Sequence, residues 1–182
     1  MEQLEPAPTR SSFAGRALGA ATFRIEIYEE VEHDQDATGQ AAIVVGIVAL
    51  AAALGGLRLG PGGLIAGILS AYLGWALWSG TCYLVGVQLF QGTADWGELL
   101  RTVGFAQVPG VLLALRVLPG IGLPVYLAVL AWMVATVLVA IRQALDISSG
   151  RALATALAGF VPYMLGKLLI ELLFGITPAL LP

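Results

Sequence analysis

Residues 121–141 read IGLPVYLAVLAWMVATVLVAI, and no residue in this stretch carries a charge. A run of about 18 or more apolar residues can satisfy its backbone hydrogen bonds as a helix inside a hydrocarbon core of about 30 Å. This stretch therefore predicts a helix that crosses a membrane.

Other apolar stretches of similar length surround it in the sequence. They are Ala41–Leu57, Leu64–Leu89, Leu99–Leu118 and Ala152–Phe174. The second of these is long enough to tilt or to extend past the membrane interface. Together with Ile121–Ile141, the stretches predict an all-α fold: a polytopic membrane bundle of five transmembrane helices within residues 37–182.

The composition agrees with a membrane protein. Hydrophobic residues make up 58% of the chain and charged residues 12%, with a mean hydropathy of +0.88. A soluble domain has about 25% charged residues. Eight of the 12 acidic residues precede Ala41, so the formal charge of −3 belongs to the N-terminal segment. We therefore expect no binding to nucleic acid.

The N-terminal 36 residues fall into two parts. Residues 1–12 predict a disordered tail, and residues 13–36 predict a cytoplasmic or interfacial helix. Its apolar residues recur at helical spacing, as Ala14, Ala17, Leu18, Ala21, Ile25 and Tyr28, with Arg16, Arg24, Glu26, Glu29 and Glu30 at other positions. Such a helix either lies on the membrane surface or packs against the cytoplasmic ends of the bundle.

Basic residues near the spans predict the orientation, because acidic residues contribute little to it. One side holds Arg10, Arg16, Arg24, a loop with Arg101, and a loop with Arg142 and Arg151; the other holds Arg58 and Arg116. This distribution predicts a cytoplasmic N-terminus. With an odd number of spans, the C-terminus lies outside.

Lys167 and Glu171 are the charged pair within the last predicted span. A lone charge at the bilayer centre costs about 2.5–3.5 kcal/mol on insertion scales, and the spacing of four residues lets these two neutralise each other. One interpretation is an intramembrane polar site, joined by Gln107, for a lipid headgroup or a proton. The other is that both side chains extend to the outer interface.

Prolines and small residues within the spans indicate how the helices pack. Pro109 and Pro162 each remove a backbone hydrogen bond and predict a kink. Gly67 and Gly74 belong to a stripe of small residues that allows close approach of another helix, in the same chain or in a second copy.

The residues offer little support for catalysis. His33 is the single histidine, and a metal site with Glu29 and Asp36 is less favoured than a solvated acidic surface. Ser79 lies within a span, but no histidine lies within a span to act as its base. We expect no catalytic residue, metal or cofactor, and no enzymatic activity.

Three stretches resemble the bacterial branch of the Yip family. They are YEEVEHD at 28–34 with ATGQA at 37–41, WGELLR at 96–101 with GFAQVPG at 104–110, and RQALDI at 142–147. The resemblance covers about residues 22–175 and implies a five-span domain in the bacterial plasma membrane. Eukaryotic relatives bind Ypt/Rab GTPases, but this chain lacks their Asp-Leu-Tyr-Gly-Pro motif, so Rab binding is not expected.

Two hypotheses of function follow from these patterns. The first is a non-enzymatic membrane organiser or scaffold, whose partners are the lipid bilayer and other membrane proteins or copies of itself. The second is a small transporter or lipid-moving protein that uses Lys167, Glu171, Gln107 and the prolines. A water-accessible cavity at those residues would favour the second hypothesis, and a tightly packed bundle the first.

Overall fold

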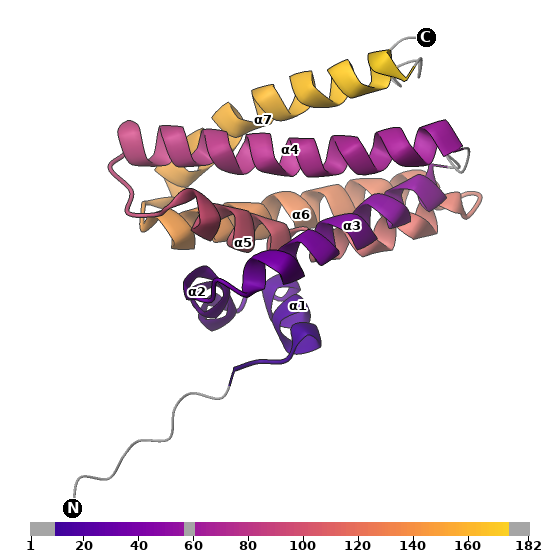
Figure 1. The fold of residues 1–182 in the computed structure, drawn as a ribbon. Helices are drawn as coiled ribbons and strands as arrows, with labels where there is room; N and C mark the ends of the chain where they lie inside the picture. The colour runs from indigo at the N-terminus through magenta and orange to yellow at the C-terminus, as the bar shows by residue number, and fades with distance from the viewer. Residues whose placement is uncertain (1–9, 57–60, 175–182) are drawn as a thin grey trace, which may run out of the picture.

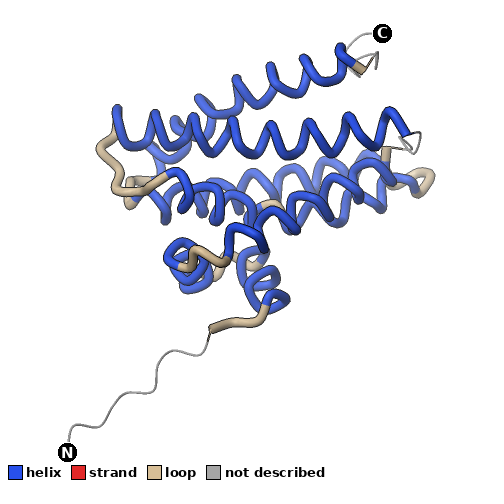
Figure 2. Tube along the Cα trace, viewed as in Figure 1, coloured by secondary structure: helices blue, strands red, loops and turns tan. Residues whose placement is uncertain are grey.

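The computed structural model of the protein describes residues 10–56 and 61–174. Within these ranges it is helical and contains no strand (Figure 2). In the part of the chain that the structure describes, five helical segments are long and apolar enough to cross a membrane. The predicted class, an all-α membrane bundle, is confirmed.

The long helices lie side by side (Figure 1). The spans are α3 (Ala37–Gly55), α4 (Pro61–Gln88), α5 (Trp96–Ala106) continued by the 3₁₀ helix η1 (Val108–Val117), α6 (Gly122–Leu145) and α7 (Ser149–Leu173). The first span begins four residues before the predicted start, and the fourth ends four residues after the predicted end. Leu57, the predicted end of the first span, lies outside the described residues.

The third span changes helix type at its middle. Its α-helix begins with a capping box, in which Asp95 accepts from the Glu98 N–H and Glu98 accepts from the Asp95 N–H, both at 2.7 Å. It ends at Ala106, and Pro109 lies in the first turn of η1, where a missing N–H costs little. The predicted kink is therefore a transition from an α-helix to a 3₁₀ helix.

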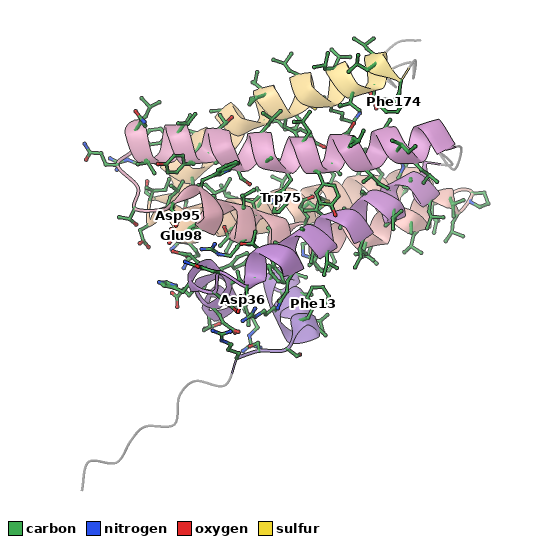
Figure 3. The ribbon with its side chains drawn as sticks, in the orientation of Figure 1. Phe13, Asp36, Trp75, Asp95, Glu98 and Phe174 are labelled. Carbon is green, nitrogen blue, oxygen red and sulfur yellow. The ribbon has the colours of Figure 1, made fainter. Side chains whose placement is uncertain are left out.

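Neighbouring helices pair in a defined order. α7 packs mainly on α4, whereas η1 packs on α3 and α6. We call the end at which α3, α5 and α7 begin the N side of the bundle. Asp95 and Glu98 lie at this end and Phe174 near the other (Figure 3). The Thr93 hydroxyl donates to Asp146 at 3.1 Å there, which joins the α4–α5 and α6–α7 connections.

The expected single helix over residues 13–36 is wrong, because the segment folds as two short helices. They are α1 (Phe13–Ala21) and α2 (Ile25–His33). Phe23 between them has a φ of 62°, in the left-handed region, and the Thr22 hydroxyl donates to the Leu18 carbonyl at 2.8 Å. The chain therefore turns back, and both helices pack on one flank of the bundle (Figure 1).

Candidate functional site

Lys167 and Glu171 form an ion pair within α7. The distance from Nζ to Oε1 is 2.7 Å, and the side chains are 36% and 6% exposed respectively. The carboxylate is thus buried in the bundle while the ammonium group remains partly accessible. The pair is therefore a polar centre within the last span. Removal of one member of a buried ion pair costs more stability than removal of both members.

Gln107 does not join this pair. It forms the C-cap of α5 and precedes η1, whose main neighbours are α3 and α6, whereas α7 packs mainly on α4. Two open apolar grooves on the surface of the described residues, one beside Trp96 and one beside Ala17, are not lined by Gln107, Lys167 or Glu171. The predicted three-residue site is therefore divided between two regions of the bundle.

The predicted packing residues differ from one another in their surroundings. A Cβ added at Gly74 would lie 2.5 Å from Cδ2 of the Tyr163 ring on α7, so this glycine allows a close helix contact. A Cβ at Gly67 would meet no atom within 4 Å. Pro162, the residue before Tyr163, does not interrupt α7, which is helical on both sides of it. Within one chain, the stripe of small residues thus allows close helix packing at Gly74, whereas Gly67 faces open space.

Polar side chains inside the spans bind main-chain oxygens of neighbouring helices. Trp75 Nε1 donates to Leu100 O at 3.0 Å, Trp78 Nε1 to Ala156 O at 3.1 Å, Thr136 Oγ1 to Ala106 O at 2.7 Å, and Ser79 Oγ to Leu99 O at 3.5 Å. Ser70 differs, because its hydroxyl oxygen is buried without a hydrogen-bond partner among the described residues. The four hydrogen bonds from Trp75, Trp78, Thr136 and Ser79 connect α4, α5, α6 and α7.

Arg16 of α1 is buried, although the pattern of charges had placed it on a polar helix face. Its guanidinium donates to Glu30 at 2.8 and 3.0 Å, to Asp34 at 2.6 Å and to Gln40 at 3.2 Å. The hydrogen bond from Arg16 holds the pKa of the Asp34 carboxyl below its usual range. This cluster, which we call the Arg16 clamp, joins α1 to the end of α2 and the start of α3.

Arg101 is also buried, and its predicted position in a loop is wrong. It lies in α5, 6% exposed, and Nε donates to the carbonyl oxygens of Val31 and Glu32, both at 3.0 Å. Carbonyl groups in the last turn of a helix lack partners within the helix, and a cation there interacts favourably with the helix dipole. Arg101 therefore fastens the end of α2 to the third span.

Two further bonds hold the N-terminal helices against α6. Trp132 Nε1 donates to Ala21 O at 2.8 Å, and the Tyr28 hydroxyl lies 2.9 Å from Ala20 O and 3.3 Å from Thr136 O. Tyr28 is fully buried. These contacts and the Arg16 clamp were not predicted from the sequence, because their partners are distant in the chain. The acidic residues that cluster after Arg16 were the one available signal for the clamp.

Acidic groups gather where α2, α5 and the end of α6 meet. Partial burial and the carboxylates of Glu98 and Asp146 raise the pKa of Glu32 to about 7. The Glu29 carbonyl, 2.9 Å from Nδ1, and the Glu32 carboxylate raise the pKa of His33. Among residues 10–56 and 61–174, no three His, Cys, Asp or Glu side chains are grouped so that they could hold a metal ion.

Comparison with known families identifies a match over most of the chain. The profile of the Yip1 domain family matches residues 22–170, a range that extends from the turn before α2 almost to the end of α7. No curated protein and no solved structure matches the chain.

Proposed function

Because the chain belongs to the Yip1 domain family and has five segments able to cross a membrane, we propose that it is a non-enzymatic membrane organiser. In this role it holds other membrane proteins, or copies of itself, by contacts within the bilayer. The observation that supports the proposal best is the use of polar groups. Trp75, Trp78 and Thr136 donate to main-chain oxygens of adjacent helices, and these bonds maintain a packed bundle.

The proposal includes an orientation in a bacterial plasma membrane, with the N side in the cytoplasm. Basic residues near short loops favour the cytoplasmic side. Arg24, Arg142 and Arg151 are exposed, and the latter two flank the α6–α7 connection at the N side. At the other end, Arg116 lies over the ring of Tyr126, with 4.5 Å between its Cζ atom and the ring centroid.

A small transporter or lipid-moving protein is the second candidate. The buried carboxylate of Glu171 beside Lys167 favours it, because ionisable residues within spans often mark a transport pathway. The two candidates differ in what the purified protein does in vesicles. A transporter moves lipid or ions across the bilayer, and an organiser associates with protein.

Two measurements on the full-length chain distinguish them. Reconstitution into vesicles should give neither faster phospholipid scrambling nor faster proton flux than empty vesicles. Cross-linking in native membranes should give a reproducible protein partner or a second copy. Scrambling or flux that is lost in Lys167→Met would favour the transporter.

Variants test the absence of chemistry within the same cross-linking experiment. His33→Ala and Ser79→Ala should leave the cross-linked species unchanged, because neither residue acts on a substrate in this proposal. Gly74→Leu should abolish the species by forcing α4 and α7 apart, whereas Gly67→Leu, at an open position, should preserve it. Loss of the species in His33→Ala at normal abundance would instead favour an enzyme, whereas loss in Ser79→Ala would also follow from the missing bond to Leu99 O.

A further inference from the structure

The flank that carries α1 is also where the lipid-facing surface of the bundle ends. Exposed apolar side chains on this flank include Ile47 of α3 and Val111 of η1. Toward the N side, α1 and α2 cover the bundle, and residues such as Phe105 and Val137 are buried. α1 therefore lies along the edge of the surface that faces the acyl chains of the membrane.

α1 is buried on one side and apolar on the other. Arg16 and Gly19 are buried against α2 and the bundle, whereas Leu18 is 67% exposed and Phe13 38% exposed. Phe13 also contacts Phe105, with 6.3 Å between the ring centroids, and lies on the flank of the bundle (Figure 3). The open side of α1 thus continues the lipid-facing surface of the spans.

A groove of about 390 Å³ runs between α1 and the spans. Its walls are apolar side chains from three elements: Ala14, Ala17 and Leu18 of α1, Val44 and Ile47 of α3, and Val111 of η1. The volume is near the lower end of the about 300–1,000 Å³ that is usual for small-ligand sites.

The depth of the groove places it beside acyl chains. Val44 and Ile47 lie seven and ten residues after Ala37, the start of α3, which corresponds to about 10–15 Å along the helix axis. One leaflet contributes about 15 Å to the hydrocarbon core. With the start of α3 at the edge of the hydrocarbon core, the groove lies within the leaflet on the N side, below the headgroups.

The lining also selects the kind of ligand. A peptide in the groove would leave its N–H and C=O groups without partners, which is costly in an apolar environment. A hydrocarbon chain has no such groups. The Arg16 clamp and the bond from Trp132 to Ala21 hold α1 in place, so the groove is formed before a ligand enters.

We propose that this groove between α1, α3 and η1 binds one acyl chain of a phospholipid from the leaflet on the N side. The bound chain fills the space beside Ala17 and extends the contact between α1 and α3. The site is independent of the organiser role, since it depends only on the position of α1 against the spans.

The test is photo-labelling of the full-length protein in lipid nanodiscs. A phosphatidylcholine with a diazirine midway along one acyl chain is added as a minor component, and labelled peptides are quantified by mass spectrometry. Labelling of Phe13–Leu18 and Val44–Ile47 should exceed that of Leu153 and Leu157 several-fold. These two leucines are exposed on the N-side half of α7 and report contact with bulk lipid.

Variants that fill the groove provide the control. Ala17→Phe should lower groove labelling to the level of the α7 reference, whereas Ala154→Phe, at an exposed alanine of α7, should leave it unchanged. Circular dichroism and thermal unfolding confirm that each variant is folded, and Ala14→Phe replaces Ala17→Phe if the latter is not.

Three outcomes would overturn the proposal. The first is equal labelling of the groove and the α7 reference, and the second is unchanged groove labelling in a folded Ala17→Phe or Ala14→Phe variant. The third is preferential labelling by a diazirine fatty acid or cross-linking of the groove to a second copy, either of which would identify a different occupant.

Discussion

At the scale of single residues, Glu32 predicts how stability depends on pH. Its carboxyl group is partly buried near Glu98, Asp146, Glu29 and His33, and the Arg101 guanidinium donates to its main-chain carbonyl oxygen. Burial, the largest cause, raises its pKa from 4.5 to about 7. The folded state therefore binds the proton more tightly than the unfolded state. The resulting stability is fully present below pH 4.5 and is lost as the pH rises through 7.

Glu32→Gln removes this titration. The variant should melt at a higher temperature than the wild type at pH 8, and the advantage should shrink as the pH falls from 7 toward 4.5. Thermal unfolding in detergent across this range measures it. Glu26→Gln, at an exposed carboxylate of the same helix, should show no such trend. A difference in melting temperature between Glu32→Gln and the wild type that is the same at every pH would contradict the interpretation.

Gly74 and Gly67 give a matched pair on the same helix. Gly74→Ala places a methyl group against the Tyr163 ring, which packs against both Trp78 and Phe160. Such overpacking costs about 1–3 kcal/mol. Gly67→Ala enters open space and gains up to about 1 kcal/mol of helix propensity. Unfolding in detergent should show that Gly74→Ala is less stable than Gly67→Ala. An equal loss of stability in both variants would refute the packing assigned to the two glycines.

At the scale of elements, the Arg16 clamp determines whether α1 stays on the bundle. Arg16→Met leaves the carboxylates of Glu30 and Asp34 without their central cation, and breaking a buried pair costs about 3–5 kcal/mol. We expect the amides of α1 to exchange hydrogen faster while those of α3 to α7 keep their protection. Arg24→Met, at an exposed arginine, is the control. Unchanged exchange in α1 would show that the clamp is dispensable.

The elements also show what the sequence could predict. Apolar length identified the spans, because this signal is local. The turn at Phe23 and the burial of Arg101 were not predictable in this way. Arg101 binds carbonyl groups about 70 residues earlier in the chain, and hydrophobic periodicity carries no information on such a contact. Arg101, a charged residue near the start of the third span, was therefore predicted to lie in a loop.

The candidate site was predicted less well than the fold. The pairing of Lys167 with Glu171 follows from their spacing of four residues on one helix. The separation of Gln107 from that pair depends on which helices are neighbours. Sequence spacing does not define this order, since the connections between spans are compatible with several arrangements of the helices in the bundle.

At the scale of the whole molecule, the positions of the basic residues predict the orientation in the membrane. The α6–α7 connection, with Arg142 and Arg151 beside it, lies at the N side, and the η1–α6 connection lies at the opposite end. Retention of basic segments in the cytoplasm predicts that the first connection is cytoplasmic and the second is outside.

Single cysteines in a Cys82→Ala background test this orientation in intact bacterial cells. Ser148→Cys is a conservative change in the α6–α7 connection, at a residue whose side chain makes no capping bond. Pro119→Cys lies in the exposed η1–α6 connection. A membrane-impermeant maleimide should label Pro119→Cys at once and Ser148→Cys only after the cells are permeabilised. The reverse pattern would place the N side outside, and the arginine distribution would then require another explanation, such as binding to a partner that overrides the charge bias.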